Sequence, residues 1–425
     1  MNKFLFRIIF IGLCIIPKSV IPCTIFFAKS QSKILVAGNE DWSDPFTKIW
    51  VYQRSIDNYG VLFIGHSDFQ AQFGINEYGL TVDYATIPKV EENEFKGKQN
   101  YEKDLFLEIL SKCKTLKDAE IYLAKYRYPS SYHQAMISDA SGNSAIVNGN
   151  GIFKNSYKYQ IATNFNVSKK NDIIDCSRFK IVKETILASS DISVDLFTSI
   201  LSLTHQEALN PTQYSYIVDH MKNELHLFSF HDFEHKVILD YKELIAKGFM
   251  LKDFKELFPS VFAEHEFRLN HKDSLKQSFV KRIQRNEGIA KVIADFEEMS
   301  TKDSTVADYP FLFIKVSMSI LAEVLLTETN GKPFQYWWYP WEYFHLKTND
   351  ASLDKTLVLL DYLEKIPKEN SRQNIGTFEF KGVLHKLLGN IDIAKEYFTK
   401  TLKISPKETG NYLRAKSFLE YLNSK

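Results

Sequence analysis

Residues 23–42 read CTIFFAKSQSKILVAGNEDW, and their pattern of short apolar runs is the clearest indication of the fold. A cysteine opens a short apolar run, polar residues follow, and a second apolar run begins at residue 34. Further runs of this kind, separated by turn residues, recur as far as about Tyr241. Short β-branched and aromatic runs bounded by turn residues are typical of strands. We therefore predict a strand-rich body, with strands that include residues 34–37, 49–52, 61–64, 144–147 and 159–162.

Two helical segments interrupt this strand-rich part. Residues 101–113 carry apolar side chains at helical spacing, from Leu105 to Leu110, which predicts an amphipathic helix. Thr115 and Asp118 then match the pattern of a capping box, so we expect a second helix to begin there. Strand groups with helices inserted between them predict an α+β fold in which helices cover layered sheets.

The sequence pattern changes near residue 245, where long amphipathic runs replace the short β-rich ones. Within them, residues 375–408 resemble a tetratricopeptide-like helix pair, with small residues such as Gly382 and Ala394 where the helices would touch. A lone repeat of this kind cannot bury its own face. We therefore predict two domains after residue 22: a strand-rich domain at 23–245 and a helical domain at 246–425.

The charge balance limits the kinds of partner. The 425 residues contain 53 Lys and Arg against 52 Asp and Glu, which gives a net charge of +1. A domain that binds nucleic acid through its overall electrostatics carries a clear excess of positive charge. We therefore expect no nucleic-acid partner.

Residues 1–22, MNKFLFRIIFIGLCIIPKSVIP, combine Lys3 and Arg7 with an apolar run that is too short to span a bilayer. This pattern predicts a signal peptide or propeptide that is removed, and hence export to the periplasm or the outside of the cell. Signal peptidases favour a small residue before the cut, whereas Pro22 precedes Cys23. We therefore expect cleavage upstream, followed by trimming or self-cleavage before Cys23. A retained membrane anchor and a lipid-modified Cys23 are the alternatives.

The cysteines and histidines give no sign of a metal site. Beyond residue 22 the chain has Cys23, Cys113 and Cys176, so at least one thiol stays unpaired. There is no CxxC motif, and the eleven histidines lack metal-ligand spacing. The sequence therefore predicts neither a metal nor a cofactor.

A cysteine at the very start of a mature domain has a particular chemical use. Its own α-amino group, whose ordinary pKa is about 7.7–8.0, can take the thiol proton and act as general base. Cys23 would occupy this position once residues 1–22 are removed. A buried or incidental cysteine is the alternative interpretation.

Several blocks in order from Cys23 to about Phe230 resemble the choloylglycine hydrolase and penicillin V acylase family. Members begin with a Cys-Thr pair, as at Cys23-Thr24, and continue with a Gly-Arg-Asn-x-Asp turn, here residues 37–41. The resemblance implies that Asp41 hydrogen-bonds the nucleophile and its amine. Gly38 stands where bile-salt hydrolases carry a catalytic arginine, which puts bile-salt specificity in doubt.

Later blocks supply the other site residues that the resemblance implies. The Gly-Ile-Asn-Glu-Tyr-Gly-Leu turn at 74–80 precedes Thr86, which by counting contributes to the oxyanion hole, with Tyr84 as the alternative. Asn164, in a Thr-Asn pair, donates to the oxyanion. Arg178, in a Ser-Arg-Phe block, lies close to the cysteine; a surface ion pair is its alternative role. Hairpins are expected at 136–144 and 212–228.

The resemblance implies a four-layer αββα N-terminal-nucleophile hydrolase sandwich that precedes the helical domain. Its activity would be hydrolysis of a linear carbon–nitrogen amide bond in a small-molecule substrate, through a thioester on Cys23. An acyltransferase that passes the acyl group to an amine acceptor is one alternative. The other is a catalytically silent binding protein that recruits a protein partner through the helical domain, which the missing arginine at Gly38 favours.

Overall fold

The computed structural model of the chain describes most residues from Cys23 onward. Residues 1–22, which hold the predicted signal, lie outside the described residues. The described ranges are 23–90, 97–101, 103–128, 130–155, 157–169, 176–207, 210–271, 273–285, 287–302, 312–333, 343–365, 371–407 and 409–424.

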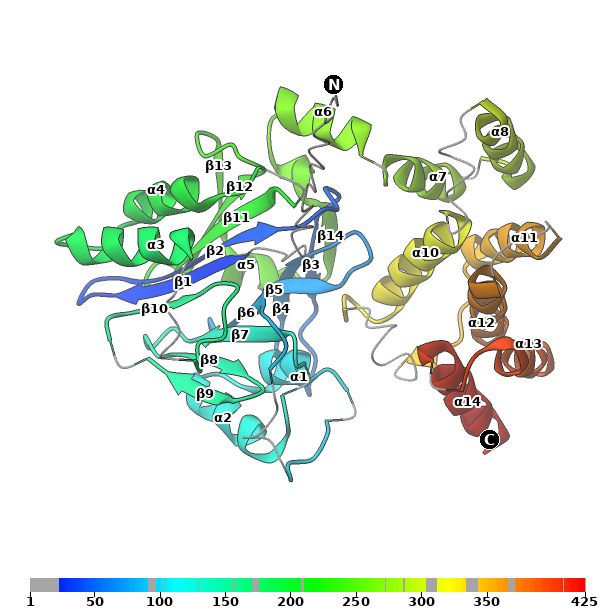
Figure 1. The fold of residues 1–425 in the computed structure, drawn as a ribbon, viewed down its shortest axis with the longest axis horizontal. Coiled ribbons are helices and arrows are strands. Elements are labelled where there is room, and N and C mark those ends of the chain that lie inside the picture. Colours follow the sequence, from blue (N-terminus) through cyan, green and yellow to red (C-terminus); the bar gives the residue numbers. More distant parts are fainter. Residues whose placement is uncertain are drawn as a thin grey trace, which may run out of the picture.

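The strands of the described residues form two antiparallel sheets (Figure 1). One sheet has six strands in the order β10-β1-β2-β11-β12-β13, and the other has eight in the order β14-β3-β4-β5-β6-β7-β8-β9. The strands are β1 (Thr24–Lys29), β2 (Ile34–Asp41), β3 (Lys48–Tyr52), β4 (Val61–Gly65), β5 (Ala71–Asn76), β6 (Thr81–Thr86), β7 (His133–Ser138), β8 (Ser144–Asn148), β9 (Gly151–Lys154), β10 (Tyr159–Ala162), β11 (Thr212–Asp219), β12 (Glu224–Ser229), β13 (Lys236–Asp240) and β14 (Met250–Asp253).

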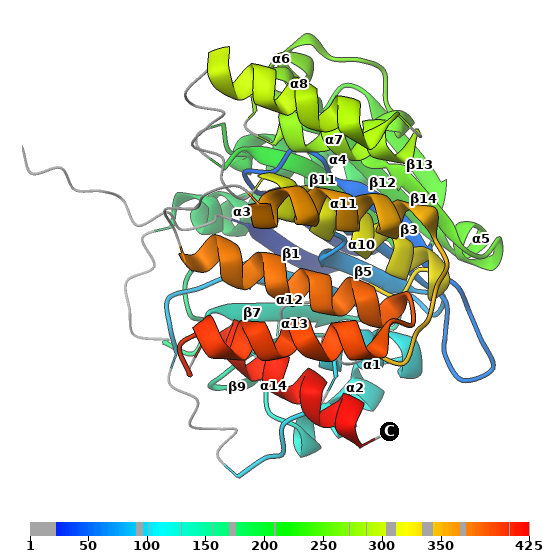
Figure 2. The same cartoon turned by 90° about the vertical axis from the view of Figure 1, so that its right-hand side faces the viewer.

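The helices of the described residues gather on the outer sides of these sheets and in the C-terminal part (Figure 2). They are α1 (Leu105–Lys112), α2 (Leu116–Lys125), α3 (Ser177–Ala188), α4 (Val194–Thr204), α5 (Tyr241–Ala246), α6 (Phe262–Asn270), α7 (Ser274–Gln284), α8 (Ile289–Lys302), α10 (Leu312–Glu328), α11 (Ala351–Lys365), α12 (Ser371–Leu387), α13 (Ile391–Ile404) and α14 (Gly410–Asn423), with a 3₁₀ turn at Phe254–Leu257.

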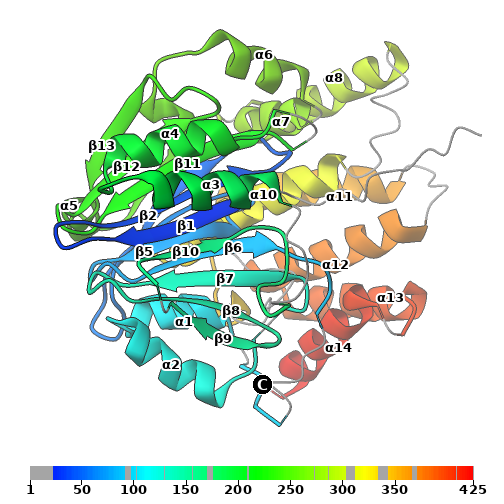
Figure 3. The ribbon, with the colours of Figure 1, turned by 60° about the vertical axis from the view of Figure 1, so that its left-hand side comes forward.

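The strands near the middle of the sheets are buried on both faces, because each face packs against another layer. In β1, Ile25 and Phe27 belong to the cluster between the two sheets, whereas Phe26 packs with Phe197 of α4 on the outer face. Because side chains alternate between the two faces of a strand, the apolar run of β1 contributes side chains to two separate cores. Figure 3 shows α3 and α4 in front of the six-stranded sheet.

The predicted local features of the strand-rich part are confirmed. All five strands named from the sequence are present, as are the hairpins β7–β8 and β11–β12. The helix expected at 101–113 is present as α1 but begins only at Leu105, where Asp104 caps it, and Thr115 and Asp118 form the expected capping box of α2. Gly79 has φ +84 in the turn between β5 and β6, a conformation that glycine adopts without strain.

The C-terminal helices cover the outer face of the eight-stranded sheet. A single hydrophobic cluster joins Trp50 and Phe63 of that sheet to Phe279 of α7 and Leu321 of α10. The indole nitrogen of Trp50 also donates to the carbonyl oxygen of Gly331 at 3.1 Å. The two predicted halves therefore share one core.

The division into domains at residue 245 stays a prediction, but the secondary structure crosses it. Residue 245 lies inside α5, and β14, which follows, pairs with β3 at the edge of the eight-stranded sheet. Farther on, α12 and α13 pack together, and a Cβ added at Gly382 would lie 2.7 Å from the Phe398 ring. A small residue is therefore needed there, as the helix-pair interpretation expects, although the tetratricopeptide-like character itself stays a prediction.

Within the part of the chain that the structure describes, every helix is either too short or too polar to cross a membrane.

Candidate active site

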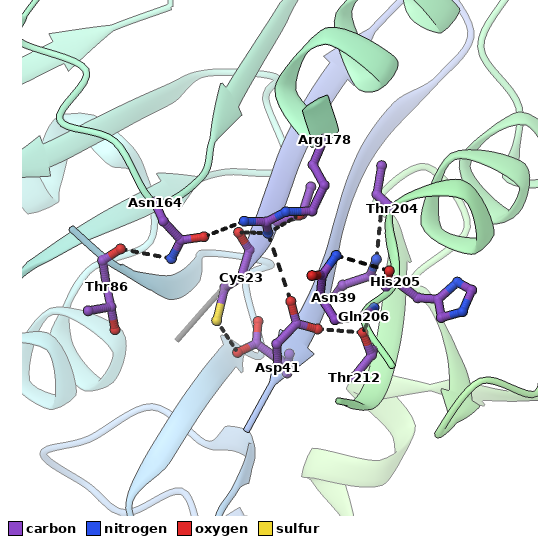
Figure 4. Close-up of polar contacts among 12 residues, drawn as sticks. Cys23, Asn39, Asp41, Thr86, Asn164, Arg178, Thr204, His205, Gln206 and Thr212 are labelled. Atoms are coloured by element: carbon purple, nitrogen blue, oxygen red, sulfur yellow. Dashed lines mark hydrogen bonds and ion pairs between the residues drawn. The ribbon is translucent and has the colours of Figure 1, made fainter. Parts of the chain in front are cut away.

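Cys23 lies immediately before β1, a strand inside the six-stranded sheet. On one side β1 pairs with β2 and on the other with β10, both antiparallel. When this register is continued to the first residue, Cys23 comes to lie between Glu40 and Asn164. Its side chain is only 5% exposed and belongs to the cluster between the two sheets. Figure 4 shows the polar side chains that surround it.

Arg178 connects the predicted site residues to one another. Its Nη1 donates to the carbonyl oxygen of Cys23 and to Oγ1 of Thr24, both at 2.8 Å. Its Nη2 donates to Oδ1 of Asn164 at 2.7 Å, and Nη1 lies 3.8 Å from Oδ2 of Asp41. The guanidinium therefore acts as a fork with several partners in fixed directions. The alternative of a surface ion pair is wrong, since the Arg178 side chain is only 12% exposed.

Asn164 follows β10 and points its amide nitrogen toward the eight-stranded sheet. Its Nδ2 donates to the carbonyl oxygen of Thr86 at 2.8 Å, while its Oδ1 accepts from Arg178. These two bonds fix which end of the amide is the donor. Thr86 thus meets Asn164 through its backbone. Tyr84, the alternative candidate, packs its ring against Phe106 in the cluster on the other face of the sheet from Cys23.

Asp41 is buried beside Cys23 and hydrogen-bonds its thiol through the backbone, while its side chain has other partners. Its Oδ1 accepts a hydrogen bond from Oγ1 of Thr212, and its Oδ2 faces Arg178. Burial raises the pKa of Asp41, and Thr212 and Arg178 oppose this shift. Within the described residues, Oδ2 has no hydrogen-bond partner.

The side chain that contacts the thiol is Glu40, which sequence reasoning missed. Sγ of Cys23 donates to Oε2 of Glu40 at 3.7 Å. Glu40 is the cross-strand neighbour of Cys23 and is 3% exposed. Glu40 lies between Asn39 and Asp41 at the polar end of β2, so the sequence alone did not single it out.

A second carboxyl group, Asp83 of β6, lies next to Glu40 across the space between the sheets. The hydroxyl of Tyr216 donates to Asp83 Oδ2. A Cβ added at Gly38 would lie 2.7 Å from the Tyr216 ring and 2.8 Å from Asp83 Oδ2. The space that a side chain at position 38 would need is therefore filled by an aromatic ring and a carboxyl group.

These buried acids set the electrostatics around Cys23. Burial raises the pKa of the Cys23 thiol, and the neighbouring Glu40 raises it further. Burial and then Asp83 raise the pKa of Glu40, and burial raises that of Asp83 to about 7. Adjacent carboxyl groups that cannot both ionise hold a proton between them. Burial and Glu40 both favour the protonated form of the Cys23 thiol.

The element that presents Arg178 was also missed. The Ser-Arg-Phe block opens α3, whereas the sequence reading placed no helix there. The helix has buried residues only at Val182 and Ile186, so its apolar stripe is narrow. All three described cysteines, Cys23, Cys113 and Cys176, are unpaired, which agrees with the prediction of at least one free thiol.

Comparison with known proteins finds neither a family model nor a curated protein that matches this sequence. Solved structures do match. Two structures of conjugated bile acid hydrolase from Clostridium perfringens are 17% and 16% identical to this chain, with TM-scores of 0.43 and 0.44. The matches cover 55% and 56% of this chain, and 96% and 99% of the two hydrolase chains. Penicillin V acylase from Agrobacterium tumefaciens is 16% identical and covers 49% of this chain and 82% of its own, with a TM-score of 0.40.

The chain is similar to the choloylglycine hydrolase and penicillin V acylase family. The names of these structures are those of the family whose motifs the sequence resembles. The likeness covers about half of this chain, and every TM-score is below 0.5. The side chains around Cys23, and not this likeness, are therefore the evidence that bears on function.

Proposed function

We propose that this chain hydrolyses a linear carbon–nitrogen amide bond of a small-molecule substrate, with Cys23 as an N-terminal nucleophile. The observation that carries this proposal is the set of contacts around Arg178. One guanidinium holds the carbonyl of Cys23, the amide of Asn164 and the carboxylate of Asp41 in one place. The two sheets, with helices on their outer sides, support the four-layer αββα sandwich that the motifs imply.

Removal of residues 1–22 would convert the nitrogen of Cys23 from an amide into an amine. Only the amine has a basic lone pair that can take the thiol proton. Asp41 Oδ2, which is buried and accepts no hydrogen bond from the described residues, supports a role in orienting that amine. The signal peptide and export of the protein are parts of the same proposal.

The acyl transfer would proceed in two steps. Sγ of Cys23 attacks the amide carbon, and the α-amine passes the thiol proton to the leaving amine. Water, with the same amine as base, then hydrolyses the thioester. Asn164 is the donor for the negative oxygen of both tetrahedral intermediates, since Arg178 holds its Oδ1 and leaves Nδ2, which bonds the carbonyl oxygen of Thr86, as the donating end of the amide.

A catalytically silent binding protein is the second candidate, and the acidic surroundings of Cys23 favour it. Gly38 leaves no room for the arginine of bile-salt hydrolases, and Glu40 disfavours the thiolate. In this case the helical domain would recruit a protein partner. Turnover of any amide that depends on Cys23 would exclude this second candidate.

The test uses a panel of N-acyl amides that includes bile-salt conjugates, penicillin V, N-acyl lactones and N-acyl amino acids. We expect Cys23→Ser to abolish nearly all turnover and Asn164→Ala to lower kcat by about 10²–10³-fold, as a lost oxyanion donor does. Cys113→Ser is the control, because that cysteine is buried on the outer face of the eight-stranded sheet. Full activity of Cys23→Ser would refute the mechanism. Product analysis in the presence of an added amine acceptor distinguishes hydrolysis, which releases the free acid, from acyl transfer, which yields a new amide.

A further inference from the structure

We propose that His205, Glu207 and His231 form a binding site for one divalent transition-metal ion of the zinc class. One ligand atom from each residue lies within 4.8 Å of the other two, and no ion is present. His205 ends α4, Glu207 follows two residues later, and His231 comes after β12. The fold therefore brings together donors that sequence spacing does not reveal.

The hydrogen bonds of His205 leave one ring nitrogen facing the site. Its Nδ1 lies 2.5 Å from the carbonyl oxygen of Ser202, to which it donates. In a neutral ring the other nitrogen, Nε2, is then an acceptor. Yet Nε2 lies 3.0 Å from Oε1 of Glu207, which is also an acceptor. A positive species, a proton or a metal ion, must lie between them.

His231 favours the metal over the proton alone. Its ring lies 4.8 Å from the ring of His205, centroid to centroid, and is stacked on Phe230 at 4.0 Å. Phe230 has φ +54, an uncommon conformation for an aromatic residue that turns the chain directly before His231. Nε2 of His231 is buried and has no hydrogen-bond partner within the described residues. A proton between His205 and Glu207 leaves this nitrogen unsatisfied, whereas a metal ion engages it.

The donor set indicates the class of metal. Two imidazole nitrogens and one carboxylate suit zinc and its neighbours, whereas calcium and magnesium prefer oxygen ligands. Zinc bonds of about 2.0–2.2 Å bring ligand atoms to about 3.3 Å from one another, so the set has to contract on binding. The side chain of Glu207 is 75% exposed and can move toward the histidines. Three protein ligands leave a fourth position for water.

The site adjoins the catalytic residues through one short chain of contacts. The backbone of Gln206, between two of the ligands, exchanges hydrogen bonds with Thr212, and Oγ1 of Thr212 donates to Asp41 (Figure 4). A metal ion would therefore stabilise the backbone at Gln206, which positions Thr212 and through it the carboxyl group of Asp41. Its binding does not depend on the proposed amidase activity.

The experiment titrates the full, tag-free protein with Zn²⁺ in a calorimeter and with Co²⁺ in a spectrophotometer. We expect one Zn²⁺ per chain, with binding weakened at least about tenfold in Glu207→Gln and in His231→Gln. His235→Gln is the matched control, because His235 is an exposed histidine nearby that pairs with Asp232. It should bind as the wild type does. Zn²⁺ should also raise the melting temperature of the wild type but not that of Glu207→Gln.

The Co²⁺ spectrum separates this site from the three thiols. Nitrogen and oxygen ligands give weak visible bands without the intense sulfur-to-cobalt charge transfer that a cysteine ligand produces. Absence of saturable binding, equal binding in all variants, or a thiolate spectrum would each overturn the proposal. If His231→Gln fails to fold, the variant at the exposed Glu207 decides alone.

Discussion

At the scale of single residues, the most unusual feature is the buried carboxyl group of Asp83 in the space between the sheets. Burial raises its pKa from 3.8 to about 7. The folded protein thus holds this proton more tightly than the unfolded chain does. The stability that the proton contributes is complete below pH 4 and is lost as the pH rises toward 7.

We therefore expect Asp83→Asn to flatten the decrease in unfolding free energy between about pH 4 and pH 7. Urea unfolding at a series of pH values measures this slope in both proteins. Asp57→Asn is the matched control, because Asp57 is exposed. An equal slope in wild type and Asp83→Asn would show that Asp83 does not titrate in this range.

At the level of the secondary-structure elements, the side chains of Tyr216 from β11 and Asp83 from β6 lie so close to Gly38 of β2 that the position has no room for a side chain. A methyl group there would overlap the Tyr216 ring and Asp83. Such overpacking typically costs about 1–3 kcal/mol. Gly38→Ala should therefore be destabilised by this amount in chemical denaturation.

The matched control for this substitution is Gly288→Ala. A Cβ at Gly288 meets no atom within 4 Å, so its effect should stay within about 0.5 kcal/mol. Equal stability of the two variants would mean that Tyr216 and Asp83 move aside without cost, and that the space at Gly38 is not closed.

Sequence reasoning found the elements whose pattern is local and missed those that depend on the fold. The strands named from the sequence, helix α1 and the capping box of α2 follow from short-range signals. The edge strand β14 was missed because it lies after the change of pattern and is defined by its pairing with β3. At the site, the motifs supplied Cys23, Asn164 and Arg178, which the structure brings into contact.

Glu40 shows why the rest of the site could not be predicted. The motif pointed to the neighbouring Asp41 as the partner of the thiol, because a resemblance assigns a role to a residue by its position in the motif. Which of two adjacent side chains faces Cys23 depends on the face of β2, and therefore on the pairing register of β1 and β2. The sequence also did not reveal the cluster of His205 and His231, because the fold of the chain between these residues brings them together.

At the scale of the whole molecule, the strand-rich and helical parts share the cluster that includes Trp50 and Phe279. The contact at Gly331 is close as well, because a Cβ there would lie 2.2 Å from the carbonyl oxygen of Val51. Elements that share one core unfold together. We therefore expect a single calorimetric transition whose van't Hoff and calorimetric enthalpies agree. Two resolved transitions would contradict the shared core and restore a division near residue 245.

In the proposed mechanism the active protein uses a free α-amine on Cys23 as its general base. Intact-mass analysis and N-terminal sequencing of the exported protein that turns over an amide test this requirement. We expect the active chain to begin at Cys23 and its amine to be unmodified. An active protein that still carries Pro22, or one whose Cys23 amine is acylated, would contradict it, because neither has a basic nitrogen beside the thiol.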